Sequence, residues 1–147
     1  MELWQLEARE AIRDLVARYN ANGDSGRFAQ VIELFAPDAV MELHDGRVHH
    51  GHDEIMTIFT GTRDHVRSGT TPTHLRHLTA THQIDLVDPS TARGRSYYQV
   101  LTTVGLDHWG RYIDEYRTVD GVWRFARRRV TVDGRSPDSL FPATSTD

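Results

Sequence analysis

The chain has 147 residues, of which 38% are hydrophobic and 26% charged, as expected of one globular domain with its own core. Its net charge of −4 gives no basic footprint for a phosphate backbone, and no apolar run approaches the roughly 18 residues that cross a bilayer. Because cysteine is absent, disulfides, thiolate catalysis and cysteine-ligated zinc are excluded. We therefore expect a cytoplasmic protein that binds neither nucleic acid nor membrane.

The first third of the chain has helical periodicity. Apolar residues recur three and four positions apart over residues 3–22, and Gly23 suits the end of that helix. A second helix is predicted from Arg27. It must end by Ala36, because Pro37 disfavours helical backbone in the residue before it.

A short hairpin and a third helix follow. Residues 39–44 read as a strand, and Asp45-Gly46 is typical of a hairpin turn. The third helix is predicted from about Asp53. Residues 61–72 contain glycine, proline, threonine and serine and are therefore expected to form a loop.

The second half of the chain reads as long strands. The extended segments are residues 73–87, 91–105, 109–119 and 122–132, with a bend near Asp107-His108 and a hairpin at Asp120-Gly121. Helices followed by antiparallel strands predict an α+β domain over residues 1–135. We expect a cone-like, curved, mainly antiparallel sheet wrapped around three N-terminal helices, with a pocket at its open end. Residues 136–147 are predicted to be a tail or a partner-dependent arm.

Nine histidines are candidates for chemistry near neutral pH, and four of them cluster. The cluster contains His44, His49, His50 and His52. A metal site is one interpretation, but a short exposed hairpin does not fix three ligands in a common geometry. The alternative is a polar rim, with Asp53 helping to start the third helix. We expect no metal and no cofactor.

Asp24 and His77 each allow two interpretations. Asp24 follows the first helix and is either a helix cap or a carboxylate turned into the mouth of the cone. His77 alternates with Thr79, Thr81 and Gln83, so it lies on the polar face of its strand. That face is bulk solvent, a subunit interface or a polar-lined cavity.

Tyrosines and arginines favour structural roles on pattern alone. Tyr19 is typical of a core or interface residue. Arg127, Arg128 and Arg129 alternate between the two faces of a strand and suggest a solvated edge, while Trp123 and Phe125 beside them read as core residues.

The chain resembles the SnoaL-like family of the nuclear-transport-factor-2-like superfamily over about residues 3–133. The matching pieces are residues 11–19, Asp24, residues 34–40, Gly51, Ile55, residues 76–78, residues 110–112, Glu115, Tyr116 and residues 120–125. The resemblance implies a cone-shaped α+β barrel. It does not imply one function, because this fold serves isomerases, dehydratases, hydrolases, cyclases and binding modules.

The pattern is similar to hexachlorocyclohexane dehydrochlorinase and to the scytalone and bile-acid dehydratases. In those lyases an Asp after the first helix and a His on the first long strand form a dyad. The resemblance places these roles on Asp24 and His77, with Tyr19 as the tyrosine at the end of the first helix. The second histidine of scytalone dehydratase falls near Thr102. The arginine of the dehydrochlorinase falls at Val119, so Arg128 is the candidate substitute.

We therefore expect a cofactor-independent lyase or isomerase for a hydrophobic, cyclic small molecule. His77 is the expected general base, Asp24 its orienting carboxylate, Tyr19 a hydrogen-bond donor, and Arg128 a stabiliser of negative charge. The expected apolar lining is Phe28, Phe35, Phe59 and Trp123. A homodimer or homotrimer built on the outer face of the sheet is also expected. Two alternatives stay open: a noncatalytic binding or assembly module, and an accessory subunit resembling the small subunit of ring-hydroxylating dioxygenases.

Overall fold

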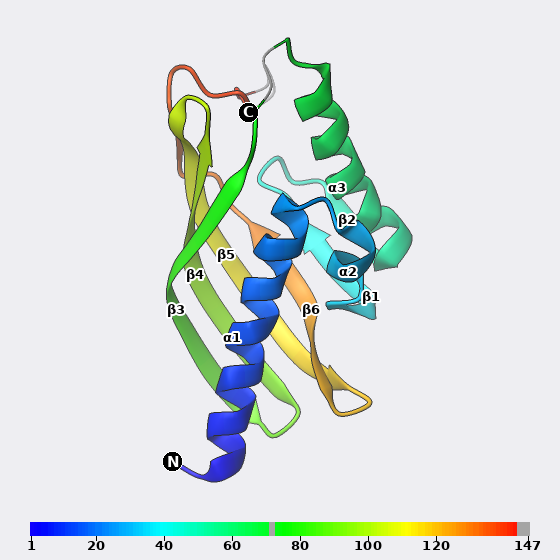
Figure 1. Cartoon of the computed structure of the whole chain (residues 1–147). Coiled ribbons are helices and arrows are strands. Elements are labelled where there is room, and N and C mark those ends of the chain that lie inside the picture. The colour runs from blue at the N-terminus through cyan, green and yellow to red at the C-terminus, as the bar shows by residue number, and fades with distance from the viewer. Residues whose placement is uncertain (71–72, 144–147) are drawn as a thin grey trace.

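The computed structural model of the chain describes residues 1–70 and 73–143, and Figure 1 shows its elements in order. The helices are α1 (Leu3–Asp24), α2 (Phe28–Ile32) and α3 (Gly51–Ser68). The strands are β1 (Phe35–Glu42), β2 (Val48–His50), β3 (Arg76–Asp88), β4 (Thr91–Thr102), β5 (Gly105–Val119), β6 (Val122–Val130) and β7 (Gly134–Arg135).

All strands belong to one curved sheet in the order β2-β1-β6-β5-β4-β3, with β7 added to β5. Among the described residues, only β1 and β6 pair in parallel, and the other strand pairs are antiparallel. The sheet curves around α1, while α3 packs on β1 (Figure 1). The predicted α+β cone with three N-terminal helices is thus confirmed.

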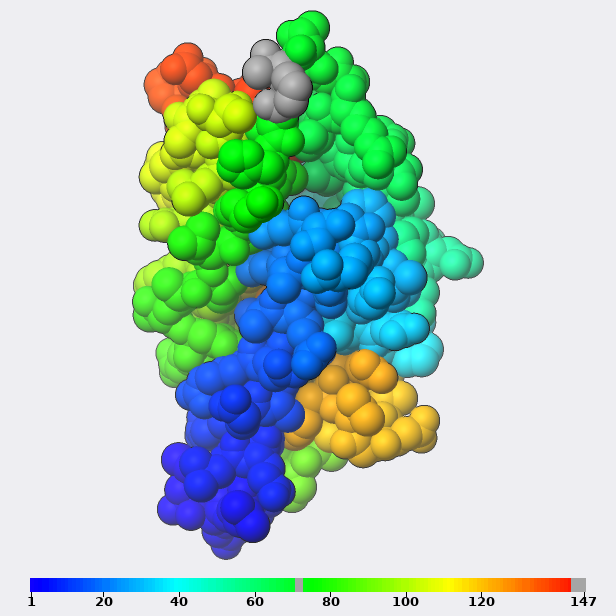
Figure 2. Space-filling view, in the orientation of Figure 1, coloured from blue at the N-terminus to red at the C-terminus, as the bar shows by residue number. Residues whose placement is uncertain are grey.

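Helix α1 covers the inner face of the sheet because one of its faces is apolar. Ile12, Leu15, Val16 and Tyr19 recur at helical spacing and are buried. The helix packs on β3 and β6, and it lies across the front of the molecule in the space-filling view (Figure 2). No helix in the described part of the chain is long and apolar enough to span a membrane.

The second helix ends before Ala36, as Pro37 predicts: its last residue is Ile32, and Phe35 then lies opposite Phe125 of β6. Two other predicted boundaries are wrong. The strand expected at residues 39–44 runs instead from Phe35 to Glu42, because it pairs with β6. Pro37 is tolerated in β1, where the register with β6 shifts. The loop expected at 61–72 is helical as far as Ser68, since Gly61 lowers helix stability by only about 1 kcal/mol. Residues 71–72 of that prediction lie outside the described residues.

A bulge in β3 explains how a polar strand face turns inward. The register with β4 shifts between Ala80 and Gln83, and Thr81 has φ +53°. Before the bulge His77 faces inward while Leu78 is exposed; after it, Ile84 is buried. Strict alternation therefore holds only on each side of the bulge.

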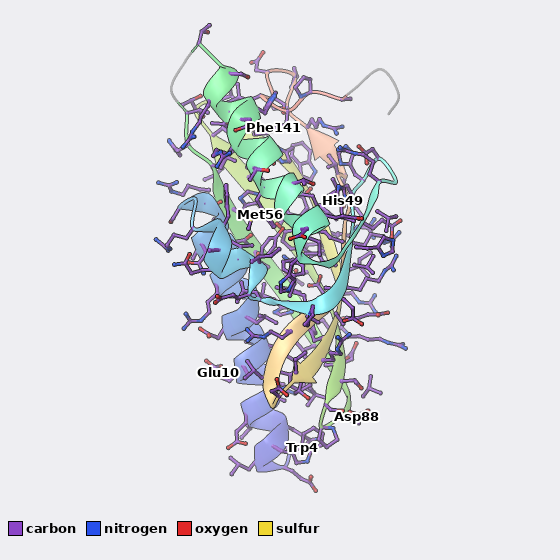
Figure 3. The ribbon with its side chains drawn as sticks, turned by 90° about the vertical axis from the view of Figure 1, so that its right-hand side faces the viewer. Trp4, Glu10, His49, Met56, Asp88 and Phe141 are labelled. Carbon is purple, nitrogen blue, oxygen red and sulfur yellow. The ribbon has the colours of Figure 1, made fainter. Side chains whose placement is uncertain are left out.

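The segment after β7 lies against the body of the protein. The Ser136 N–H donates to the backbone oxygen of Asp107 at 2.8 Å, and the Arg135 Nε donates to the Phe141 carbonyl at 3.0 Å. Phe141 lies beside α3 (Figure 3). Of the expected tail, residues 144–147 lie outside the described part of the chain.

Candidate active site

Asp24 and His77 form a hydrogen-bonded pair at the end of α1. The Asp24 Oδ1 lies 2.6 Å from the His77 Nδ1, and its Oδ2 accepts the His77 backbone N–H at 2.9 Å. Asp24 is the last residue of α1, and His77 is the second residue of β3. The cap interpretation of Asp24 is wrong, because α2 begins after Arg27 without a side-chain cap.

This geometry fixes the orientation of the imidazole. A carboxylate accepts hydrogen bonds only, so the Nδ1 that faces Asp24 carries the proton and the Nε2 of a neutral ring has a free lone pair. The His77 side chain is 25% exposed and that of Asp24 is 11% exposed. The Nε2 is thus the basic atom of the pair, and the pair is open to a ligand.

An aromatic cluster packs behind the pair. The Tyr19 ring lies edge-on to Phe35 at 6.0 Å and to Phe59 at 5.8 Å between centroids, and Phe28 lies 5.9 Å from Phe59. These four predicted residues are therefore brought together. Burial raises the pKa of the Tyr19 hydroxyl, and although Arg128 acts in the opposite direction, the hydroxyl stays protonated as a hydrogen-bond donor.

Arg128 lies in the core, so its interpretation as part of a solvated edge is wrong. Its side chain is 0% exposed, and its Nε and NH2 donate to the two oxygens of Asp114 at 2.8 and 2.9 Å. The guanidinium stacks on Tyr19 and Tyr112, 4.3 and 3.8 Å from the ring centroids. Its NH1 is buried and has no hydrogen-bond partner in the described structure. Arg128 thus presents one unused donor beside Tyr19.

Trp123 does not join the other predicted residues. It lies opposite Thr118 on β5, ten residues along that strand from His108, which shares a sheet row with His77. At 3.3 Å per residue this separates Trp123 from the row of His77 by roughly 30 Å. Trp123 packs at the other end of the core.

Aromatic side chains and the Arg128 guanidinium pack between α1 and the sheet, behind the pair. Two hollows of the described surface lie away from the pair. One cleft of about 580 Å³ separates the β1–β2 hairpin from β5 and β6, and a shallow hollow lies on α1 near Leu6. The His77 side chain is 25% exposed, so a ligand can reach the pair from that side.

Sequence reasoning missed three polar residues of this region. Asn20 is buried and donates to the Thr79 hydroxyl at 2.6 Å, which joins α1 to β3. Asp107 and His108 form a second carboxylate–imidazole pair, with Nδ1 and Oδ1 2.7 Å apart. The bend expected at this point is wrong, because both residues belong to β5. The only hint in the sequence was that an aspartate and a histidine, Asp107 and His108, are adjacent.

The four-histidine hairpin forms no metal site in the described part of the chain. No group of three or more His, Asp or Glu side chains there is arranged to hold a metal ion. The His52 Nε2 lies 2.9 Å from the Phe35 carbonyl, and the His50 N–H donates to Glu54 at 2.6 Å. These contacts fix the start of α3, whose first turn also contains Asp53.

The profile of the SnoaL-like domain family matches residues 4–129. No curated protein sequence matches the chain. A protein from Novosphingobium aromaticivorans DSM 12444 that is proposed to be a scytalone dehydratase superimposes with a TM-score of 0.80 and 22% identity, covering 92% of this chain and 91% of that chain.

A hexachlorocyclohexane dehydrochlorinase from Novosphingobium barchaimii LL02 superimposes with a TM-score of 0.79 and 16% identity, covering 97% of this chain and 100% of that chain. A Mycobacterium tuberculosis protein of unknown function gives a TM-score of 0.72 and 26% identity, covering 97% and 83%. At these identities the first two structures establish a shared fold only.

Proposed function

Because the chain belongs to the SnoaL-like domain family, we propose that it uses the Asp24–His77 pair as a general base on a small molecule. The reaction class is a cofactor-independent elimination or isomerisation of a hydrophobic, cyclic substrate. The observation that carries the proposal is the 2.6 Å contact between the Asp24 carboxylate and the His77 Nδ1. Likeness to a dehydrochlorinase and to a proposed dehydratase supports the choice of reaction.

In this proposal the His77 Nε2 removes a proton from a substrate carbon. In an elimination, the electron pair of the broken C–H bond forms a carbon–carbon double bond and expels a group from the neighbouring carbon. In an isomerisation, the electron pair shifts along the substrate and the His77 imidazolium returns the proton to another carbon. The imidazole becomes positively charged, and the adjacent Asp24 carboxylate stabilises that charge. No external electron acceptor is needed for either reaction.

Tyr19 and Arg128 supply hydrogen-bond donors in this scheme. A buried donor without an acceptor costs about 1–3 kcal/mol, and a ligand oxygen or halide would recover that loss at the Arg128 NH1. Both side chains are buried, so they act on a substrate only when it displaces part of the aromatic cluster. The rings of Phe28, Phe35 and Phe59 favour an apolar, flat ligand.

Turnover of a panel of cyclic compounds tests the proposal. The panel contains rings with a halide or a hydroxyl β to a C–H bond, and rings with a movable double bond, with products followed by mass spectrometry. We expect His77→Gln to lower the rate on a converted compound about 10²–10⁴-fold. His74→Gln is the matched control, because His74 is exposed and precedes β3. Equal rates in the two variants would contradict the proposal, and ligand binding without conversion would indicate a noncatalytic binding module.

We also propose that the chain self-associates, as a homodimer or homotrimer, through the outer face of the sheet. Leu78, Tyr97, Leu101 and Trp109 are exposed large apolar residues on neighbouring strands of that face. Several large apolar residues exposed on one face of a sheet are typical of protein interfaces. Sedimentation at micromolar concentration should show an oligomer, and Tyr97→Glu should shift it toward monomer. A monomeric unaltered chain would contradict this proposal.

A further inference from the structure

A second histidine is held in the same way as His77. The His108 Nδ1 lies 2.7 Å from the Asp107 Oδ1, and the His108 side chain is 15% exposed. Neighbouring residues of a regular strand point to opposite faces. Here the register of β5 with β4 shifts at Asp107, so both side chains turn inward and can bond to each other.

His108 and His77 lie in one row across the sheet. Val100 of β4 pairs with His77 of β3 on one side and with His108 of β5 on the other. Laterally paired residues share a face, so both imidazoles project inward from backbones about 10 Å apart, twice the strand spacing. The Tyr98 ring lies 6.5 Å from the His77 ring and 6.3 Å from the His108 ring. The two imidazoles therefore lie on the inner face on either side of Val100, and both lie near the Tyr98 ring.

Asp107 and the C-terminal segment fix the His108 ring. The buried Asp107 carboxylate also accepts hydrogen bonds from the Ser139 hydroxyl and from the Leu140 N–H at 2.9 Å. The Phe141 ring packs between His108 and His65 of α3, 5.3 and 5.0 Å from their rings. The His65 Nε2 in turn lies 2.7 Å from the Leu140 carbonyl oxygen. This segment therefore walls one side of His108, and Asp107 is its positioning residue.

The unused nitrogen of His108 is an acceptor. Burial lowers the pKa of His108; Asp107 opposes this effect, whereas His77 and Arg135 add to it, so the ring is neutral at pH 7. Its Nδ1 proton faces Asp107, which leaves the lone pair on Nε2. No partner for this Nε2 is found in the described part of the chain. The His108 Nε2 is thus an inward-facing acceptor beside His77, the proposed base, which is where a ligand-binding atom would lie.

We propose that His108 is a second substrate-contacting residue, which accepts a hydrogen bond from a hydroxyl group of the ligand held against His77. This inference rests on the proposed function for the position of the ligand. It narrows the substrate class to rings that carry a hydroxyl group across from the C–H bond served by His77. A ring that carries only halogens leaves the His108 acceptor unpaired and binds less tightly.

Phenol and toluene are a matched pair of probes, because a hydroxyl replaces a methyl group on the same ring. Binding to the full chain is followed through the imidazole NMR resonances, and the ratio of the toluene Kd to the phenol Kd is compared between variants. We expect His108→Phe to lower this ratio about fivefold, as loss of one hydrogen bond implies. The exposed control His74→Phe should leave the ratio within about twofold of its original value.

A readout on the unaltered protein makes the test independent of variant folding. Phenol should move the His108 ring resonances more than toluene does. The proposal is overturned if His108→Phe does not change the ratio of the toluene Kd to the phenol Kd, if phenol does not shift the His108 resonances, or if neither probe binds. Failure of the Asp24–His77 proposal gives a different result. In that case His77→Gln leaves the turnover rate unchanged, while phenol binding still depends on His108.

Discussion

Replacing Asp114 by asparagine should expose the cost of the buried Arg128 charge. Asp114→Asn keeps the shape of the side chain, removes its charge and replaces one acceptor oxygen by an NH2 donor, while Arg128 remains 0% exposed and always protonated. Removing one partner of a buried ion pair costs about 3–5 kcal/mol. Because domains of this kind are stabilised by about 5–15 kcal/mol, this single change should remove about a fifth or more of the free energy of unfolding.

Urea unfolding at pH 7 measures the loss of free energy directly. In thermal unfolding, the Tm should fall by roughly 6–20 °C, at about 2–4 °C per kcal/mol. Glu42→Gln is the matched control, because Glu42 pairs with a partly exposed Arg127 at 2.8 Å. That pair is worth about 0–1 kcal/mol. The double change Asp114→Leu with Arg128→Met should recover most of the lost stability. Equal losses of less than about 1 kcal/mol in Asp114→Asn and Glu42→Gln would refute this reasoning.

Three further predictions test other parts of the fold. Because the pKa of His108 is lowered on folding, the unfolded chain binds the proton more tightly. The free energy of unfolding should therefore be constant above about pH 7 and fall below about pH 6.5, and the fall should be less steep in His108→Gln. Identical pH profiles of the unaltered chain and the variant would refute this. Thr81→Gly should raise the free energy of unfolding by about 0.5–1 kcal/mol in urea titrations, because it relieves a left-handed conformation at an exposed residue; a loss of stability would contradict it. Gly110→Ala should lower the free energy of unfolding by about 2–3 kcal/mol, because the new methyl carbon would lie 2.0 Å from a backbone oxygen. Gly61→Ala in α3, where the methyl group meets no atom within 4 Å, should raise it by about 1 kcal/mol. Similar effects of the two alanines would contradict the packing argument.

Local rules predicted the parts of the fold that depend on local chemistry. The Asp120-Gly121 turn was predictable because both residues adopt positive φ, +51° and +79°, as the tight hairpin requires. Apolar spacing likewise predicted α1. The extension of β1 back to Phe35 was not predictable, because it depends on pairing with β6, some ninety residues later in the chain.

The candidate site shows the same division. Asp24 and His77 could be named from the resemblance, but their contact depends on how α1 and β3 pack together. His108 was hidden by a bulge, which no periodic pattern reveals. Arg128 looked like surface because its partner Asp114 lies opposite it only once β5 and β6 are in register.

The tautomer of His77 tests the central claim most directly. At a pH of about 8.5 imidazole rings are neutral, and nitrogen NMR distinguishes a proton on Nδ1 from one on Nε2. The unaltered chain should hold the His77 proton on Nδ1, facing Asp24, with Nε2 unprotonated as a general base requires. Asp24→Ala should move a substantial share of the population to the Nε2-protonated form. The same tautomer population in both proteins would contradict the dyad.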